Sequence, residues 1–416
     1  MQNNFDKKTD RRGTLSVKWN RKAIKSIAAD EEAEPFWVAD MDFTVAHQIA
    51  EEAVKTAEAG IYGYPHVEDK QEVFCSWAKK RHHWEVDPKQ VIISPGMLTS
   101  ISLLTEILTS EGDGVIVPFP AYQPFMRIVR NHNRNLLTWP LLYDEHTQQF
   151  SLDWDAFEVL CEQAKLLIFC SPHNPSGIAF SEEELTRLSV TAKNHGVAIV
   201  CDEIHADLSF GKHHPLLPLA SAVGCTAVTC MAPSKTFNIA GEHYSVTVFE
   251  DDSLKKTFLK RLEQLFLTET SFFSTTVALA AYEHGYQWLM DLLVYLQGNI
   301  ELIDQYCKLH IPQIKLVKPK ASFITFLDCK ELLYLVEKDA LSYPELYDPK
   351  NSPSGGLLSR FFGIRAQVAL NDGTWFGGET YRQFVRFNYG TQREAVESAL
   401  KRMDQAVQFL FETYAT

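Results

Sequence analysis

The sequence predicts an α/β fold built on a mostly parallel sheet, and three observations support this class. The segments 114–120, 165–177, 196–208 and 226–235 each open with a short apolar, strand-like run. Helix-like segments lie between several of these runs, so strand and helix signals alternate along the middle of the chain. The runs are apolar along their whole length, which is typical of strands buried on both faces.

The segment 181–196 is predicted to be one of the connecting helices. Ser181 can cap its first turn, and Glu184 three residues later completes a capping box. Gly196 supplies the stop at the carboxyl end. The next apolar run begins at once, so this helix joins two neighbouring strands.

A second unit is predicted from about residue 290 onward, where the pattern of the sequence changes. A long apolar-periodic helix comes first, and strands of a smaller α+β unit are expected at 320–328 and 384–390. The final segment, 394–414, reads as an amphipathic helix. A Pro/Ser/Gly-rich stretch at 343–356 is expected to be a surface loop.

The composition of the 416 residues narrows the function classes. Hydrophobic residues make up 45% and charged residues 22%, which is ordinary for a globular protein. The net charge of −13 disfavours a general nucleic-acid or anionic-lipid binder. We find no apolar run of membrane-helix length and no signal-peptide core, and the eight cysteines form no CxxC pair. These features predict a cytoplasmic protein with reduced cysteines and no membrane partner.

Polar residues follow three successive predicted strands, at the point where each strand ends. Asn174, Asp202 with His205, and Lys235 occupy these positions. Ligands of open α/β sheets bind outside the carboxyl ends of the strands. We therefore expect these side chains to meet in one site.

Lys235 is a candidate Schiff-base lysine. Lysine is among the residues least often buried, so a lysine at a strand end in a sheet crevice indicates a functional role. The alternative, a solvated loop lysine, describes most Ser-Lys pairs. Pyridoxal 5′-phosphate (PLP) is the common carbonyl cofactor for such a lysine, and its ring nitrogen needs a carboxylate. Asp202, at the end of the preceding strand, is the candidate for that contact. Asn174, one strand earlier, is the candidate donor to the ring hydroxylate.

Further partners of PLP can be sought in the same way. Tyr122, just after the 114–120 strand, is placed to stack on the ring. A phosphate needs amides at a helix start, and a suitable turn precedes the 99–108 helix at Gly96, Met97 and Leu98. Arg386 offers a fork-shaped cation for a substrate α-carboxylate.

The motifs at 174–177, 202–205 and 234–237 together resemble those of the fold-type I, aspartate-aminotransferase-like PLP enzymes of aminotransferase class I/II. Within that superfamily the chain is most similar to the cystathionine β-lyase, or C–S lyase, branch of the maltose-regulon modulator and cystalysin type. The segments that carry this closer resemblance are 13–19, 37–43, 62–65, 170–175 and 232–238. Matches extend from about residue 5 to 402.

This resemblance implies a large PLP-binding domain over 50–288 with a mostly parallel seven-stranded sheet. Residues 1–49 and 289–416 would form the smaller α+β domain. It also implies a homodimer with shared active sites, in which Tyr64 reaches the cofactor phosphate of the other subunit. His205 and Ser234 would join the cofactor contacts, and Asn174 would assist Arg386 with the substrate carboxylate.

The chain departs from the family pattern eight residues after Lys235. Aminotransferase relatives carry Arg there, or often Lys in this branch, as a phosphate contact, whereas this chain has His243 preceded by Glu242. The phosphate then has a weaker cationic partner or a different one. This departure leaves the cofactor assignment intact.

Three functions remain open, and the first is favoured. They are a PLP-dependent C–S β-lyase acting on an L-cysteine-derived amino acid, an aminotransferase of the same fold, and a PLP-binding regulatory protein. The lyase and the aminotransferase would use the same lysine, aspartate and arginine. No metal is expected, since His205, Asp207, His213 and His214 match no standard zinc spacing.

Overall fold

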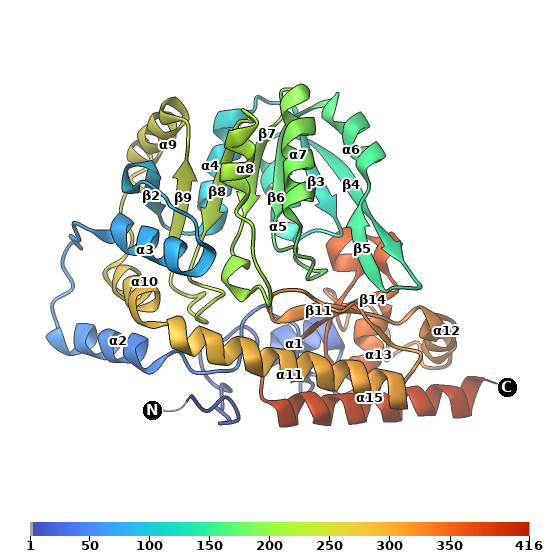
Figure 1. Cartoon of the computed structure of the whole chain (residues 1–416). Coiled ribbons are helices and arrows are strands. Elements are labelled where there is room, and N and C mark those ends of the chain that lie inside the picture. The colour runs from blue at the N-terminus through green and yellow to red at the C-terminus, as the bar shows by residue number, and fades with distance from the viewer. Residues whose placement is uncertain (1–2, 416) are drawn as a thin grey trace.

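The computed structural model describes residues 3–415. Figure 1 shows a large sheet flanked by helices in the upper half and a smaller sheet below it, where the long helices α11 and α15 lie. We call the part from α2 to α10, His47–His284, the large-sheet region. The remaining residues, from both ends of the chain, form the small-sheet region.

The large sheet has eight strands in the order β2-β9-β8-β7-β6-β3-β4-β5. All neighbours from β8 to β4 pair in parallel, whereas β9 and β5 run antiparallel to their neighbours. The strand bounds are β2 Val91–Ser94, β3 Gly114–Phe119, β4 Asn135–Asp144, β5 Gln149–Leu152, β6 Ala164–Cys170, β7 Ala198–Asp202, β8 Ala227–Met231 and β9 Ser245–Phe249.

The prediction of seven strands was wrong by one, because β5 adds an edge strand. Strand β4 is ten residues long, and the chain then turns back so that Gln149–Leu152 pairs with Leu141–Asp144. Gln148, in the turn, adopts a positive φ of 54°. The 149–152 segment is short and half polar, which gave it no recognisable strand signal.

The central strands are buried on both faces, as the continuous apolar runs predicted. Every residue of β3, β7, β8 and β9 is buried. Helices α7 and α8 lie on one face, and α4 covers the other (Figure 1). The helices of this region are α2 His47–Ala59, α3 Lys70–His82, α4 Met97–Leu108, α5 Gln123–Asn131, α6 Trp154–Cys161, α7 Glu182–Asn194, α8 Leu216–Ala222, α9 Asp252–Gln264 and α10 Phe272–His284.

Helix α7 begins with the capping box that the sequence predicted. Ser181 Oγ accepts a hydrogen bond from the Glu184 amide at 3.2 Å, and the Ser181 amide donates to Glu184 Oε2 at 2.8 Å. The helix ends at Asn194, and Gly196 adopts a positive φ of 69° that turns the chain into β7. Local sequence alone therefore sets both ends of this connection.

The small-sheet region joins the two ends of the chain. Its four-stranded antiparallel sheet has the order β10-β11-β14-β13, and the N-terminal β1 pairs in parallel with β12. Its strands are β1 Glu34–Pro35, β10 Lys315–Leu316, β11 Ile324–Asp328, β12 Val368–Ala369, β13 Asn371–Asp372 and β14 Phe384–Asn388. Its helices are α1 Arg21–Ala28, α11 Tyr286–His310, α12 Leu333–Ser342, α13 Leu357–Ala366, α14 Thr374–Gly377 and α15 Arg393–Tyr414. The division into a large domain at 50–288 and a small domain formed by 1–49 and 289–416 stays a prediction.

The N-terminal segment is held against the molecule by a buried ion cluster. Asp42 accepts hydrogen bonds from Lys18 Nζ at 2.6 Å and Arg11 Nη1 at 2.7 Å, and Lys18 is fully buried. Burial alone would raise the pKa of Asp42, but the two cations lower it. This cluster fixes the path of residues 37–43, which lead into the site described next.

All eight cysteines are free thiols, and seven of them are buried. None of the helices within residues 3–415 combines the length and the apolar character that crossing a bilayer requires.

Candidate active site

A cavity of about 320 Å³ lies at the carboxyl ends of the parallel strands. It brings together nine of the residues predicted from the sequence: Lys235, Asp202, Asn174, Tyr122, Gly96, Met97, Leu98, His205 and Ser234. Arg386 does not line the cavity itself, but its Nη1 lies 3.2 Å from Asn174 Oδ1. Tyr64 lies outside the cavity and is 92% exposed.

Lys235 lies in the turn that follows β8, and its amine reaches across to the N-terminal segment. Its Nζ donates to the backbone carbonyl of Ala39 at 2.6 Å. Burial lowers the pKa of Lys235 to about 8, although Asp40 acts in the opposite direction. A substantial fraction of the amine is therefore neutral near physiological pH, which nucleophilic attack on a carbonyl requires.

Asp202 ends β7 and is buried, with 3% of its surface exposed. Its Oδ1 accepts a hydrogen bond from the amide of Ile204 at 3.0 Å, and no cation of the described residues pairs with it. Burial raises the pKa of Asp202 to about 7. The amide of Ile204 and the charge of Lys235 act in the opposite direction, and a cationic ring nitrogen beside this carboxylate would supply a closer counter-charge.

Arg386, on β14, is a buried cation surrounded by neutral acceptors. Its Nη2 donates to Trp37 O at 2.6 Å and to Asn371 Oδ1 at 2.9 Å. Within residues 3–415 no carboxylate lies within 4 Å of it, and its buried Nε has no hydrogen-bond partner. Burial lowers the pKa of Arg386 to about 10. A buried guanidinium without a carboxylate is suited to bind one from a ligand.

Segment 37–41 lies beside the cavity. Its backbone carbonyl groups accept hydrogen bonds from side chains in distant parts of the chain. Arg386 binds the carbonyl of Trp37, and Lys235 binds that of Ala39. Asn388 Nδ2 donates to two further carbonyls of the segment. The sequence analysis missed these contacts, because a backbone acceptor carries no side-chain signature.

The start of α4 forms one end of the cavity. Gly96 has a φ of +102°, and a Cβ atom there would lie 3.1 Å from Nδ1 of His243. No side chain caps the helix, so its first amides are free for an anion. His243 and Glu242 line this end, as the departure from the family pattern suggested, but Glu242 also accepts a hydrogen bond from Ser274 Oγ at 2.9 Å.

His205 and Tyr122 close the sides of the cavity. His205 Nδ1 lies 3.0 Å from Ser322 Oγ, and burial, together with Lys235 and Arg386, lowers the pKa of His205 to about 3. Its imidazole is therefore neutral at physiological pH. Tyr122 precedes α5, and its ring centroid lies 6.2 Å from that of Trp375, an aromatic neighbour that the sequence analysis did not identify.

A buried hydrogen-bond network around Asp207 supports the turn that contains Lys235. Asp207 accepts hydrogen bonds from Thr236 Oγ1 and Trp77 Nε1, both at 2.9 Å, and lies 2.7 Å from His82 Nε2. Asp207 thus fixes Thr236, the residue beside Lys235.

Within the part of the chain that the structure describes, no three His, Cys, Asp or Glu side chains are arranged to hold a metal ion.

The residues of the cavity fit PLP. The cofactor has an aldehyde, a ring nitrogen that carries charge when protonated, and a phosphate. Lys235, the unpaired carboxylate of Asp202 and the free amides at the start of α4 match these three groups in turn. The neighbouring guanidinium of Arg386 leaves a position for a substrate carboxylate.

Comparison with known proteins gives a consistent result. The family model described as aminotransferase class I and II matches residues 38–403. Cystathionine beta-lyase PatB of Bacillus subtilis is 34% identical over 411 residues, which cover 97% of this chain and all of that protein.

Two similar solved structures cover nearly the whole chain. A PLP-bound putative aminotransferase from Clostridium difficile 630 has a TM-score of 0.87 and 31% identity, over 98% of this chain and 100% of that one. The PLP-bound C–S lyase from Staphylococcus hominis has a TM-score of 0.85 and 27% identity, over 98% of each chain.

Proposed function

Because the chain belongs to the aminotransferase class I and II family, we propose that it is a PLP-dependent carbon–sulfur β-lyase. Its substrate is an L-cysteine-derived amino acid such as cystathionine. The reaction breaks the Cα–H bond and the Cβ–S bond, and one water molecule is consumed to give pyruvate, ammonia and a thiol. The likeness to PatB, over 97% of this chain and all of that protein, carries this choice of reaction.

Arg386 binds the substrate through its α-carboxylate. A carboxylate satisfies the charge of the buried guanidinium and supplies an acceptor for its unpartnered Nε. Asn174, 3.2 Å from Nη1, assists in this contact. The interaction orients Cα and its proton within the cavity.

Lys235 is the general base that removes the Cα proton. Its lowered pKa of about 8 leaves enough neutral amine to accept a proton at physiological pH. PLP, when bound, supplies the electron sink that makes this Cα proton acidic. The carboxylate of Asp202 would balance the positive charge of the protonated cofactor ring.

The same residues hold the cofactor. Lys235 would bind it through Nζ, Asn174 and Tyr122 would contact the ring, and the amides at the start of α4 would hold the phosphate. His205 and Ser234 complete the cavity wall. His243 lines the same end of the cavity as the first amides of α4.

The enzyme is proposed to act as a homodimer in which each subunit completes the site of the other through Tyr64. Ile61 and Tyr64 are 80% and 92% exposed in the single chain. Exposed apolar side chains on one short segment are typical of an interface. The eight free cysteines support a reducing, cytoplasmic location.

The aminotransferase remains the second candidate, favoured by the PLP-bound C. difficile neighbour, which is described as a putative aminotransferase. The assay that separates the two uses the purified PLP-loaded protein with L-cystathionine and no keto acid. Release of pyruvate and a free thiol supports the lyase. Turnover only after a keto acid is added identifies an aminotransferase, and PLP binding without either activity supports a regulatory role.

A further inference from the structure

Ser322, two residues before β11, combines burial with an unusual backbone conformation. Its φ is +75°, in the left-handed region that residues with a Cβ atom rarely adopt, and it is 2% exposed. Residues other than glycine keep such conformations where their surroundings fix them, and they cluster at functional sites. The roles proposed above for the active-site residues do not include Ser322.

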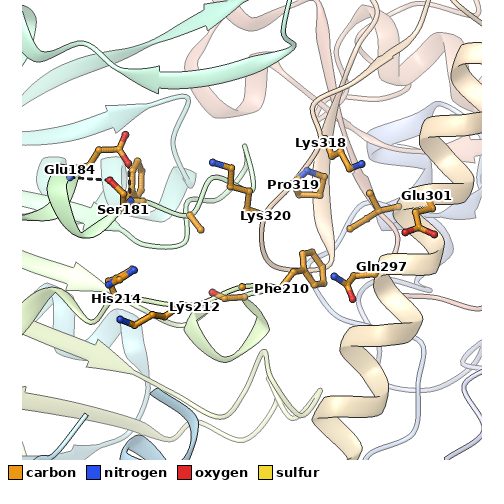
Figure 2. A pocket seen from close by; sticks show the side chains of 15 residues that line it. Ser181, Glu184, Phe210, Lys212, His214, Gln297, Glu301, Lys318, Pro319 and Lys320 are labelled. Atoms are coloured by element: carbon orange, nitrogen blue, oxygen red, sulfur yellow. Dashed lines mark hydrogen bonds between the residues drawn. The ribbon is translucent and has the colours of Figure 1, made fainter. Parts of the chain in front are cut away.

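Three hydrogen bonds hold the segment around Ser322. Its amide donates to Leu208 O at 3.0 Å, and its carbonyl accepts from the hydroxyl of Tyr389 at 2.8 Å. Two residues earlier, Lys320 O accepts from Phe210 N at 3.0 Å. Figure 2 shows the side chains of Lys320 and Phe210 in the wall of the cavity that adjoins this junction. The backbone of Ser322 is therefore fixed by contacts from both regions of the chain.

The side chain of Ser322 contacts a single polar group, the imidazole of His205. Oγ lies 3.0 Å from Nδ1 and has no other hydrogen-bond partner within residues 3–415. A hydroxyl carries one proton to donate and can also accept. If Nδ1 donated to Oγ, the hydroxyl proton would be buried without an acceptor, which is unfavourable. The contacts therefore favour donation from Ser322 Oγ to Nδ1.

This donation decides where the proton of the His205 ring lies. The ring is neutral at physiological pH, and a neutral imidazole that accepts at Nδ1 carries its proton on Nε2. Nε2 has no hydrogen-bond partner in the part of the chain that the structure describes, and it remains open to the cavity that His205 lines. The ring of Phe323 packs edge-on against the imidazole at a centroid distance of 6.1 Å. His205 thus offers one fixed donor to a ligand.

We propose that Ser322 is a positioning residue that acts through His205. It holds the His205 proton on Nε2, so that the cavity contains a neutral N–H donor. The inference rests on the proposed binding of PLP: the acceptor is the ring hydroxylate, the anionic oxygen next to the aldehyde that Lys235 attacks. A donor to this oxygen withdraws negative charge and lowers the proton affinity of the Lys235 nitrogen beside it.

The first test locates the proton on the His205 ring in the PLP-loaded, full-length protein. Histidine ring nitrogens are labelled with ¹⁵N, because their NMR shifts distinguish a protonated nitrogen from a bare one. The signals of His205 are identified by their loss in His205→Leu. A bare Nδ1 and a protonated Nε2 are expected, whereas a protonated Nδ1 would overturn the proposal. Since the readout is a ring proton, it does not depend on which reaction the enzyme catalyses.

The second test follows the pH midpoint of the visible absorbance band of covalently bound PLP. Ser322→Ala removes the hydroxyl and keeps the Cβ atom, whereas Ser322→Gly also relieves the left-handed backbone. Both should raise the midpoint by about half a pH unit or more, because each weakens the donor to the hydroxylate. Ser189→Ala removes a buried hydroxyl from α7 and should leave the midpoint unchanged. A shift in Ser322→Gly alone would assign the effect to the backbone and contradict the proposal.

A double-mutant cycle tests whether Ser322 acts through His205. His205→Leu should raise the midpoint at least as far as Ser322→Ala, and combining the two should change it little further. Additive shifts, or a midpoint in Ser322→Ala equal to that of the wild type, would refute the role of Ser322. Absence of the band from the wild-type protein would instead refute the proposed cofactor, and the NMR measurement on the same protein would still decide the position of the proton.

Discussion

Nη2 of Arg386 lies 2.9 Å from Oδ1 of Asn371, so the buried guanidinium is held by an amide at a position where a carboxylate of almost the same shape would fit. Both side chains are 4% exposed. The neutral amide orients the arginine without satisfying its charge. The choice of Asn over Asp at this position leaves Arg386 available for the carboxylate of a substrate.

The variant Asn371→Asp is expected to weaken substrate binding. The new carboxylate would pair with Arg386 and compete with the substrate, so KM should rise about tenfold or more while kcat changes less. Steady-state kinetics with L-cystathionine measure both constants. Asn371→Ser, which removes the amide without adding charge, is the control and should raise KM less than Asn371→Asp.

Replacing Lys235 with Ala is expected to abolish turnover and the visible absorbance band of covalently bound PLP. The variant removes the only proposed attachment point and the proposed base together. Activity assays and an absorbance spectrum of the desalted protein measure the two effects. Lys256→Ala, at an exposed position on α9, should retain both. A Lys235→Ala protein that keeps the band and the activity would show the assignment to be wrong.

Capture of PLP by the cofactor-free protein is expected to accelerate as pH rises through about 8. Only the neutral amine attacks the aldehyde, and the pKa of Lys235 is about 8. Because Asp40 raises that pKa, Asp40→Asn should shift the midpoint of the rate profile to lower pH. Stopped-flow absorbance over pH 6–10 measures the midpoint. A midpoint near the ordinary lysine pKa in both proteins would contradict the prediction.

Asp202→Asn is expected to stabilise the cofactor-free protein while weakening its affinity for PLP. The pKa of Asp202 is raised to about 7, so above pH 7 the folded state holds a charged carboxylate at a cost of a few kcal/mol. Between the ordinary carboxyl pKa and 7, the folded state binds more protons than the unfolded state. The advantage of the Asp202→Asn variant in unfolding free energy should therefore shrink as pH falls from 7 toward 4. Urea titrations at pH 8 and pH 5, with PLP binding measured in parallel, test both effects.

If Tyr64 completes the site of the other subunit, two defective proteins should restore one another. Lys235→Ala and Tyr64→Ala homodimers each carry a damaged group in both sites. After subunit exchange, a heterodimer contains one intact site, so random mixing should recover about a quarter of wild-type sites, as follows for a symmetric dimer. Tyr64→Phe tests the hydroxyl alone. Activity of the mixture no higher than the combined contributions of the two variants measured separately would argue against a shared site.

The strand-end rule found much of the site from the sequence. Asn174, Asp202, His205 and Lys235 were placed together because parallel strands deliver their carboxyl ends to one edge of a sheet, and the structure brings all four into one cavity. The capping box at Ser181 was equally readable, because its two partners are three residues apart.

The contacts that the sequence did not reveal are long-range. Trp37 O lies 349 residues before Arg386 in the sequence, and Ala39 O lies 196 residues before Lys235. Asn371 bonds Arg386 across two antiparallel strands whose register no local pattern specifies. Strand β5 escaped prediction for a related reason, since its pairing with β4 depends on a turn and not on its own composition.

The buried ion cluster around Asp42 has a consequence for how this protein can be handled. Lys18 and Arg11 bind Asp42. A few residues before Asp42 lie the carbonyl groups of Trp37 and Ala39, which accept hydrogen bonds from Arg386 and Lys235. A fragment trimmed to the large-sheet region would retain its strands but would lose Arg386 itself, and Lys235 would lose the Ala39 carbonyl that accepts its hydrogen bond. Expression of the sheet alone would therefore yield no minimal catalyst, and purification tags are better placed behind α15, whose carboxyl end projects from the side of the molecule in Figure 1, than close to the first twenty residues.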